Sequence, residues 1–176
     1  MQSELTFAIV PAGPSDAAEL ARVHVQAWRE TYPGILPRGY LERMSAPLHA
    51  RRWRSRLMRQ DEITLVAEGP DGLVGYASGQ WARGQGEAGE GEVTTLYVLK
   101  AAQGGGLGRI LLTGVARTLA DRGARSLVIW VLRENSRARG FYERLGGQPQ
   151  ETRGENVGGG VVPAVAYRWA DIGALV

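Results

Sequence analysis

The most constraining feature of this chain is the stretch from Glu92 to Leu112, where a β-rich run, a glycine-dense turn and an apolar segment with helical spacing follow one another. Four of the five residues from 104 to 108 are glycine. Glycines leave the backbone bare where it turns, so several N–H groups can point at one anion at the positive end of a helix. The stretch predicts a strand, a phosphate loop and a helix, although the first turn of a dinucleotide-binding fold has a similar pattern.

The size of the chain limits its organisation. With 176 residues, 44% of them hydrophobic, it is long enough to bury one substantial core and short for two domains. We therefore expect a single domain over residues 1–176. The sequence has no apolar run of membrane-spanning length and no basic segment followed by a long apolar stretch at its start. We expect a soluble, cytoplasmic protein.

The composition argues against several classes of function. The chain has no cysteine, which excludes disulfides and thiol nucleophiles, and its two histidines, His24 and His49, are too few for an ordinary zinc site. We expect no metal. The net charge is +3, and nearly all the positively charged residues are arginines, whose side chains suit phosphates. A nucleic-acid binder is the less favoured explanation of that charge, because the basic residues form no single stripe with interleaved aromatic residues.

Hydrophobic periodicity and turn residues predict alternating strands and helices. The expected strands cover residues 5–10, 63–67, 73–81, 92–98, 127–131, 148–155 and 161–169. The expected helices run from Pro14 to residue 31, over 37–44, onward from 47, over 107–122 and over 135–145. A loop is expected over residues 82–91. Together these elements predict an α/β fold.

A second motif supports the phosphate loop. Gln103, Gly106 and Gly108 fit the pattern Q/R-x-x-G-x-G/A, and about thirty residues later the chain reads NSRARGFYERLGG. With the L-Y-V run before the loop, the two blocks resemble the GNAT superfamily of acyl-CoA-dependent N-acetyltransferases, which carry N-x-x-A-x-x-F-Y-x-x-x-G-F after the fifth strand. Gly147 stands where the family usually has a final aromatic residue. The resemblance follows the element order over roughly residues 5 to 170.

The resemblance implies a GNAT fold, a central, twisted, mixed and mostly antiparallel sheet flanked by helices. It also implies acetyl-CoA as the acyl donor, held by a separated fourth strand, the glycine loop and the helix after the fifth strand. The residues that match these cofactor-binding positions are Leu96, Tyr97, Val98, Gln103, Gly104, Gly105, Gly106, Leu107, Gly108, Arg109, Asn135, Ala138, Phe141 and Tyr142. Asn135 also suits a simple helix cap.

The resemblance assigns two catalytic roles. Tyr142 matches the tyrosine thought to protonate the CoA thiolate, although a buried tyrosine that packs on the sheet is the alternative. Glu92 matches a glutamate that takes the proton from the substrate ammonium, often through water, although a glutamate at a strand start is often solvated surface. Glu87 and Glu90 are weaker candidates for this base. Without cysteine, direct transfer in a ternary complex is the simpler mechanism.

The resemblance to the family also implies an acceptor pocket at the junction of the first two helices and at the loop between the last two strands. WRETYPGILP, which starts at Trp28, resembles a large bacterial GNAT branch with W-R-x-x-Y-x-G-I-x-P. Trp28 and Tyr32 are the candidate pocket residues. Trp28 and Trp130 are more easily explained as core residues than as an aromatic wall, and His24 as a core residue.

These features predict an acetyl-CoA-dependent N-acetyltransferase acting on a primary amine of a small molecule or peptide. The alternative is a catalytically idle acyl-CoA-binding regulatory module, which would retain the glycine loop while Glu92 and Tyr142 were dispensable. The sequence leaves the acceptor and the oligomeric state open, including a homodimer.

Overall fold

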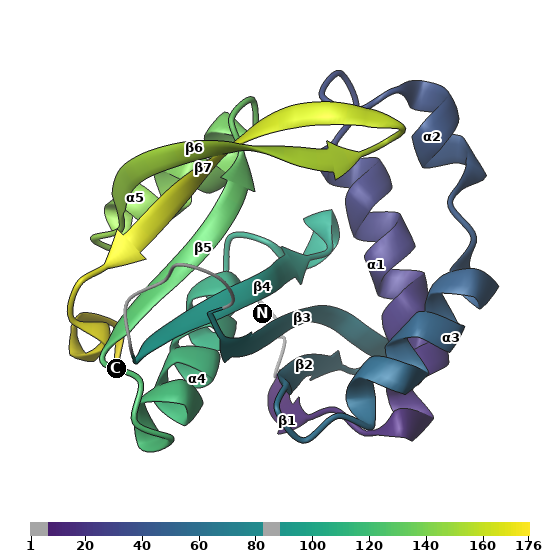
Figure 1. The fold of residues 1–176 in the computed structure, drawn as a ribbon. Coiled ribbons are helices and arrows are strands. Elements are labelled where there is room, and N and C mark those ends of the chain that lie inside the picture. Colours follow the sequence, from purple (N-terminus) through teal and green to yellow (C-terminus); the bar gives the residue numbers. More distant parts are fainter. Residues whose placement is uncertain (1–6, 83–88) are drawn as a thin grey trace, which may run out of the picture.

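The computed structural model describes residues 7–82 and 89–176, and Figure 1 shows the course of the chain. The strands are β1 Ala8–Pro11, β2 Ile63–Gly69, β3 Gly72–Trp81, β4 Glu90–Val98, β5 Ser126–Leu132, β6 Gln148–Val157 and β7 Gly160–Trp169. The α-helices are α1 Ala17–Thr31, α2 Arg38–Arg43, α3 Ala46–Leu57, α4 Leu107–Asp121 and α5 Ser136–Arg144. Three short 3₁₀ turns lie at Pro14–Asp16, Lys100–Ala102 and Ile172–Leu175.

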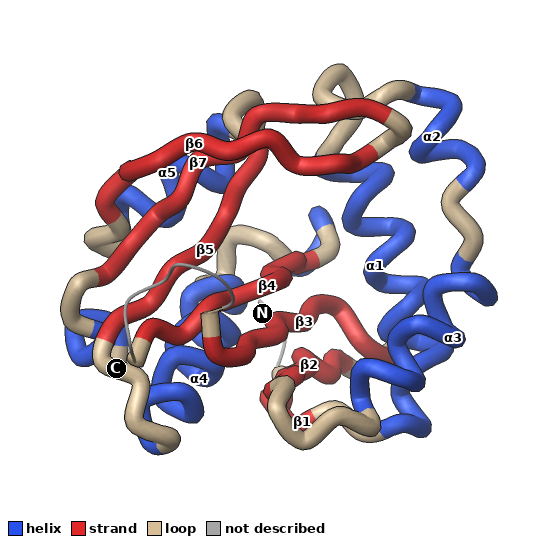
Figure 2. The backbone as a smooth tube through the Cα atoms, viewed as in Figure 1, coloured by secondary structure: helices blue, strands red, loops and turns tan. Residues whose placement is uncertain are grey.

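The strands form one sheet in the order β1-β2-β3-β4-β5-β7-β6. Neighbouring strands are antiparallel except β4 and β5, which run parallel. The connection between these two strands carries the glycine-rich turn and α4, as a parallel pair requires. Figure 2 shows the strands in red, with helices lying to both sides. This mixed, mostly antiparallel sheet flanked by helices confirms the predicted fold class.

The core lies in two layers because strand residues alternate between the sheet faces. On one face, α4 buries Leu111, Leu112 and Val115 against side chains of β2, β4 and β5. On the other face, α1 and α3 pack against β2 and β3, where Trp53 and Tyr76 are almost fully buried. Four residues of the stripe predicted for the segment after the glycine loop are buried on this face of α4, namely Leu107, Leu111, Val115 and Leu119. Ile110, the fifth, is 51% exposed, so the prediction was wrong at that position.

The β6–β7 hairpin extends beyond the sheet toward α1 and α2 (Figure 1). At its tip Gly158 lies so close to Pro37 that an added Cβ would sit 3.2 Å from the proline Cδ. Val157 and Val162 pack with Tyr40 in the same apolar cluster. The tip of the hairpin therefore packs against the α1–α2 junction, and these are the two segments between which the acceptor pocket is expected.

The loop expected over residues 82–91 ends earlier than predicted, because Glu90 and Gly91 already belong to β4. Glu90 is 3% exposed and pairs with Arg168 of β7 at 2.5 Å, which allows a charged residue to start a buried strand. The candidate base Glu87 lies outside the described residues. Within the part of the chain that the structure describes, no helix combines the length and apolar character needed to cross a membrane.

Candidate active site

A bulge in β4 determines which side chains face the site. Opposite β3, Ser78 pairs with Thr95 and Gly79 pairs with Val93, so Thr94 is an extra residue in β4. An extra residue reverses the alternation of side chains along the rest of the strand. Val93 and Leu96 accordingly both pack on the α4 side of the sheet, although residues three apart in a regular strand would face opposite sides. The bulge places Tyr97 on the opposite face, toward α1.

Strands β4 and β5 separate just beyond this bulge. Their parallel pairing covers Glu90–Val93 in β4 and ends where Val93 meets Ile129. Beyond that point β5 continues to Leu132 against β7, and β4 continues to Val98 against β3. Residues 94–98 therefore have no strand on their β5 side. Apart from the Val98 carbonyl, which accepts a hydrogen bond from the Gln103 side chain, their backbone groups on that side face an open edge that an extended ligand could pair with. This is the strand separation that the resemblance implies.

The glycine loop follows β4 and leads into α4. Gly104 and Gly106 have φ angles of +92° and +80°, which side-chain-bearing residues rarely adopt. A Cβ added at Gly104, Gly105 or Gly106 would meet no protein atom within 4 Å. Gln103 secures the loop by donating from Nε2 to the Val98 carbonyl at 2.8 Å. The first N–H groups of α4 lack partners within the helix, so the loop offers bare backbone donors beside open space.

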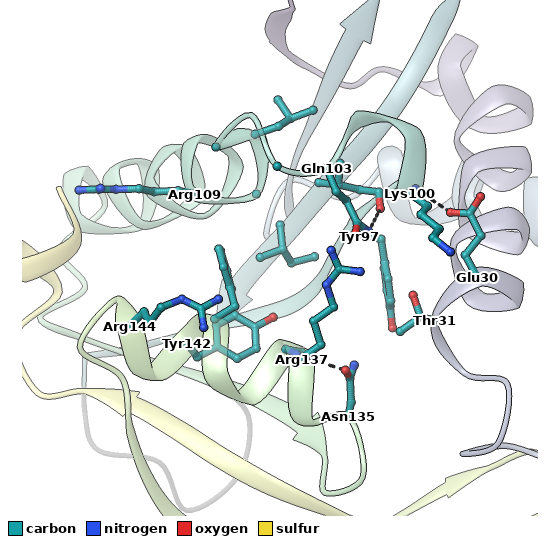
Figure 3. Close-up of a pocket in the computed structure, with 18 residues that line it drawn as sticks. Glu30, Thr31, Tyr97, Lys100, Gln103, Arg109, Asn135, Arg137, Tyr142 and Arg144 are labelled. Carbon is teal, nitrogen blue, oxygen red and sulfur yellow. Dashed lines mark hydrogen bonds between the residues drawn. The ribbon is translucent and has the colours of Figure 1, made fainter.

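A cavity of about 500 Å³ lies between this loop, the free side of β4 and α5 (Figure 3). All the predicted cofactor-binding residues line it except Gly105. Those that do are Leu96, Tyr97, Val98, Gln103, Gly104, Gly106, Leu107, Gly108, Arg109, Asn135, Ala138, Phe141 and Tyr142. Two motifs some thirty residues apart in the sequence therefore meet across one cavity.

The charges of this cavity were only partly predicted. Arg137 and Arg144 project from α5 into it, while Arg109 extends along α4 away from Tyr142 (Figure 3). With Lys100, four cationic residues among residues 7–82 and 89–176 line the cavity, against one carboxylate, Glu30. The two α5 arginines were missed because they lie at the unspecified x positions of the second motif. Their spacing before and after Tyr142 on one short helix was the available signal.

Helix α5 positions Asn135 at its N-terminus and Tyr142 near its C-terminal end. Asn135 caps the helix, since its Oδ1 accepts a hydrogen bond from the Ala138 N–H at 3.2 Å. Tyr142 is 5% exposed, and burial raises the pKa of its hydroxyl well above the usual value, with the nearby Tyr32 adding to the effect. Tyr142 is therefore neutral and holds its proton at physiological pH.

The unusual Gly147 has a structural reason. A Cβ at this position would lie 2.8 Å from the Trp169 ring, which occupies the adjacent space. Trp169 comes from β7 and packs edge-on against Tyr142, with ring centroids 6.2 Å apart. Its Nε1 donates to the Leu145 carbonyl at 2.8 Å, at the end of α5. An aromatic residue from a distant strand thus packs where α5 ends and supports Tyr142 from behind.

A second cavity, of about 300 Å³, lies between α1, β4, β5 and the β6–β7 hairpin. Both predicted pocket residues, Trp28 and Tyr32, line it, and so does the proposed base Glu92. The remaining lining residues are Val93, Thr94, Tyr97, Trp130, Leu132, Arg153, Glu155, Asn156, Val157 and Ala164. Glu90, the other described candidate for the base, lines neither cavity.

Trp28 and Trp130 were expected in the core, but both are half-buried and line this second cavity. The Trp130 ring carries the Arg153 guanidinium 3.8 Å from its centroid, and Arg153 also pairs with Glu155. Sequence periodicity missed this arrangement because Trp130 follows Ile129, the last β5 residue that pairs with β4, so its side chain meets open space and not a neighbouring strand. Trp130 therefore forms a wall that the hairpin residues complete.

Two polar residues of α1 fix its position beside this cavity. The Arg29 guanidinium donates to the carbonyls of Leu41 and Met44, both at 3.0 Å, and so caps the end of α2. His24 Nδ1 lies 2.5 Å from the Tyr76 hydroxyl in the buried layer. Burial, with smaller contributions from the charges of His49 and Arg56, lowers the pKa of His24 to about 3, which keeps it neutral. His24 is thus a core residue, as predicted.

Tyr97 lines both cavities and marks their junction. Its hydroxyl lies 2.7 Å from that of Tyr32. The two cavities differ in charge: the first holds the excess of cations, and the second holds Glu92 and Glu155 against Arg153. The site therefore joins a compartment suited to an anionic ligand with one suited to a cation.

The chain belongs to the acetyltransferase (GNAT) family, whose model matches residues 24–147. It is 32% identical over 163 residues to the uncharacterized N-acetyltransferase YuaI of Bacillus subtilis, covering 91% of both chains. Its fold is similar to that of PaiA N-acetyltransferase from Thermoplasma acidophilum, solved with coenzyme A, with a TM-score of 0.72, 22% identity and coverage of 94% and 100% of the two chains. YncA from Salmonella typhimurium, solved with acetyl-CoA, has a TM-score of 0.69 at 20% identity and covers 94% of each chain.

Proposed function

We propose that this protein transfers the acetyl group of acetyl-CoA to a primary amine of a small molecule or peptide, in a single complex that holds both substrates. The observation that carries the proposal is the junction of two oppositely charged cavities at Tyr97, where β4 and β5 separate. When bound, acetyl-CoA supplies an activated thioester carbonyl. The glycine loop, the cations and the free edge of β4 fit its pyrophosphate and its amide-containing arm.

The two catalytic roles fall to opposite sides of this junction. Glu92 lines the second cavity, which we call the acceptor cavity, as we call the first the cofactor cavity. A carboxylate there accepts the proton that an ammonium group must lose before it can attack. Tyr142 lines the cofactor cavity and holds a proton for the departing sulfur. Since burial raises the pKa of Tyr142, this hydroxyl stays protonated and can donate a hydrogen bond to the sulfur as the carbon–sulfur bond breaks.

The test is turnover of acetyl-CoA with a library of primary amines, followed by release of free thiol. With an accepted amine, Tyr142→Phe should lower kcat by roughly a hundredfold while acetyl-CoA binding is retained. Glu92→Gln should lose activity near neutral pH and recover part of it at high pH, where free amine needs no base. Glu68→Gln, on the exposed side of β2, is the matched control and should behave as wild type.

Wild-type rates in both variants, under conditions where chemistry limits turnover, would contradict the assignment of acid and base. Binding of acetyl-CoA without thiol release for any amine would favour the regulatory module instead. That alternative keeps the cofactor cavity and gives Glu92 and Tyr142 no chemical role.

A further inference from the structure

The hydroxyl pair of Tyr32 and Tyr97 has an unused donor. Each tyrosine hydroxyl carries one proton and can accept further hydrogen bonds. The pair is joined by one hydrogen bond of 2.7 Å, in which either oxygen can be the donor. Among the described residues no other hydrogen bond involves either hydroxyl, so one of the two O–H groups remains available to a ligand.

The position of the pair limits what this ligand group can be. Tyr97 lines both cavities, Tyr32 lines only the acceptor cavity, and Tyr142 lines only the cofactor cavity. A reacting acetyl group must lie where the two cavities meet, within reach of the acceptor amine on one side and of the sulfur on the other. Its carbonyl oxygen accepts hydrogen bonds and gains negative charge during attack.

We propose that the Tyr97 hydroxyl, oriented by Tyr32, donates a hydrogen bond to the carbonyl oxygen of the bound acetyl group. This inference rests on the proposed acetyl-CoA site. The order Tyr32 to Tyr97 to carbonyl uses both hydroxyl protons, and a hydroxyl that accepts one hydrogen bond becomes a stronger donor in the next. Tyr97 is the catalytic residue in this arrangement, and Tyr32 is a positioning residue.

The surroundings hold the pair in this geometry. The Tyr97 ring packs against Tyr76 and Trp28, with centroids 5.8 Å and 6.2 Å away. Tyr32 is 6% exposed and packs edge-on against Trp28 at 5.0 Å. Burial raises the pKa of both hydroxyls, so both keep their protons at neutral pH. Because the packed rings already hold the hydroxyl in place, it does not have to move when negative charge develops on the carbonyl oxygen.

The first test follows the carbonyl itself, with acetyl-CoA labelled with carbon-13 at the acetyl carbonyl. In the wild-type complex its infrared stretching band should lie at lower frequency than in free acetyl-CoA. Tyr97→Phe should move the band back toward the free value, and Tyr32→Phe should move it part of the way. Tyr76→Phe is the matched control: it removes one buried hydroxyl from the same cluster, lines neither cavity and should leave the band unchanged.

The second test measures the affinity for acetyl-CoA and for CoA, which lacks the acetyl carbonyl, by calorimetry. Tyr97→Phe should weaken acetyl-CoA several-fold and leave CoA unchanged. With an accepted amine, the same variant should lower kcat by about a hundredfold, the scale of losing one donor to a developing oxyanion. A double Tyr32→Phe/Tyr97→Phe variant should be no slower than Tyr97→Phe alone, because the two hydroxyls act as one unit.

The outcomes separate this inference from the proposed function. An unchanged carbonyl band in Tyr97→Phe, or an equal shift in Tyr76→Phe, overturns the inference even when the enzyme acetylates amines. A band that shifts as expected in a protein that acetylates no amine supports the inference and contradicts the proposed function. Failure of the wild-type chain to bind acetyl-CoA would overturn both.

Discussion

Gly106 offers a test in which folding and cofactor binding can be separated. Its φ of +80° is a left-handed conformation, and an added Cβ would meet no protein atom within 4 Å because it would project into open space beside the cofactor cavity. Gly106→Ala should therefore cost about 1–2 kcal/mol of stability through backbone strain alone. For a chain of this size that is a loss of about 2–8 °C in melting temperature. It should also weaken acetyl-CoA binding by about tenfold or more, or ~1.4 kcal/mol, because the methyl group takes space beside the backbone donors.

Gly123 provides the control at the other end of the same helix. It has φ of +100°, an added Cβ there would also meet no protein atom within 4 Å, and it lines neither cavity. Gly123→Ala should lower the melting temperature by a similar amount and leave acetyl-CoA affinity unchanged. The assays are thermal unfolding without ligand and isothermal titration with acetyl-CoA. If Gly106→Ala stays folded and binds with wild-type affinity, or if both variants lose affinity equally, the assignment of the phosphate loop is wrong.

Two further predictions concern charge. The pKa of His24 is about 3 in the native state and 6.5 in the unfolded chain, so between these pH values the unfolded chain binds one proton more than the native state. The free energy of unfolding should therefore fall by roughly 1.4 kcal/mol per pH unit as the pH drops through that window. His24→Gln should flatten the pH dependence of urea unfolding between pH 6 and 4, and an unchanged slope would contradict the neutral buried histidine. Arg137→Ala should weaken acetyl-CoA binding several-fold, and the loss should be larger at low salt than at high salt. The charge-matched variant Arg117→Ala, on the exposed face of α4, should leave the affinity unchanged. Equal losses of affinity in the two variants would argue against a direct phosphate contact by Arg137.

Much of the fold was predictable because its signals are local. Alternation and turn residues located the strands, and the α4 stripe except Ile110 followed from helical spacing. The residues of the two motifs likewise line one cavity, since short segments around Gly106 and Tyr142 supply most of its wall. The second cavity was predicted less completely because its wall is assembled from five elements, α1, β4, β5, β6 and β7. The place of Trp130 depends on where β5 leaves β4, and the space beside Gly147 depends on Trp169, twenty-two residues further on.

The site depends on β4, whose first half pairs with strands on both sides and whose second half pairs only with β3. At its start Glu90 is buried and pairs with Arg168 of β7, across the intervening β5, which ties the first residues of β4 to the rest of the sheet. Losing one partner of such a buried pair leaves an uncompensated charge, so the register there is strongly held. Four residues later the bulge at Thr94 reverses the alternation, and pairing with β5 has stopped. The free half of β4 can therefore present backbone to one ligand and the Tyr97 side chain to the junction of both cavities, while its fixed half keeps Glu92 in the acceptor cavity.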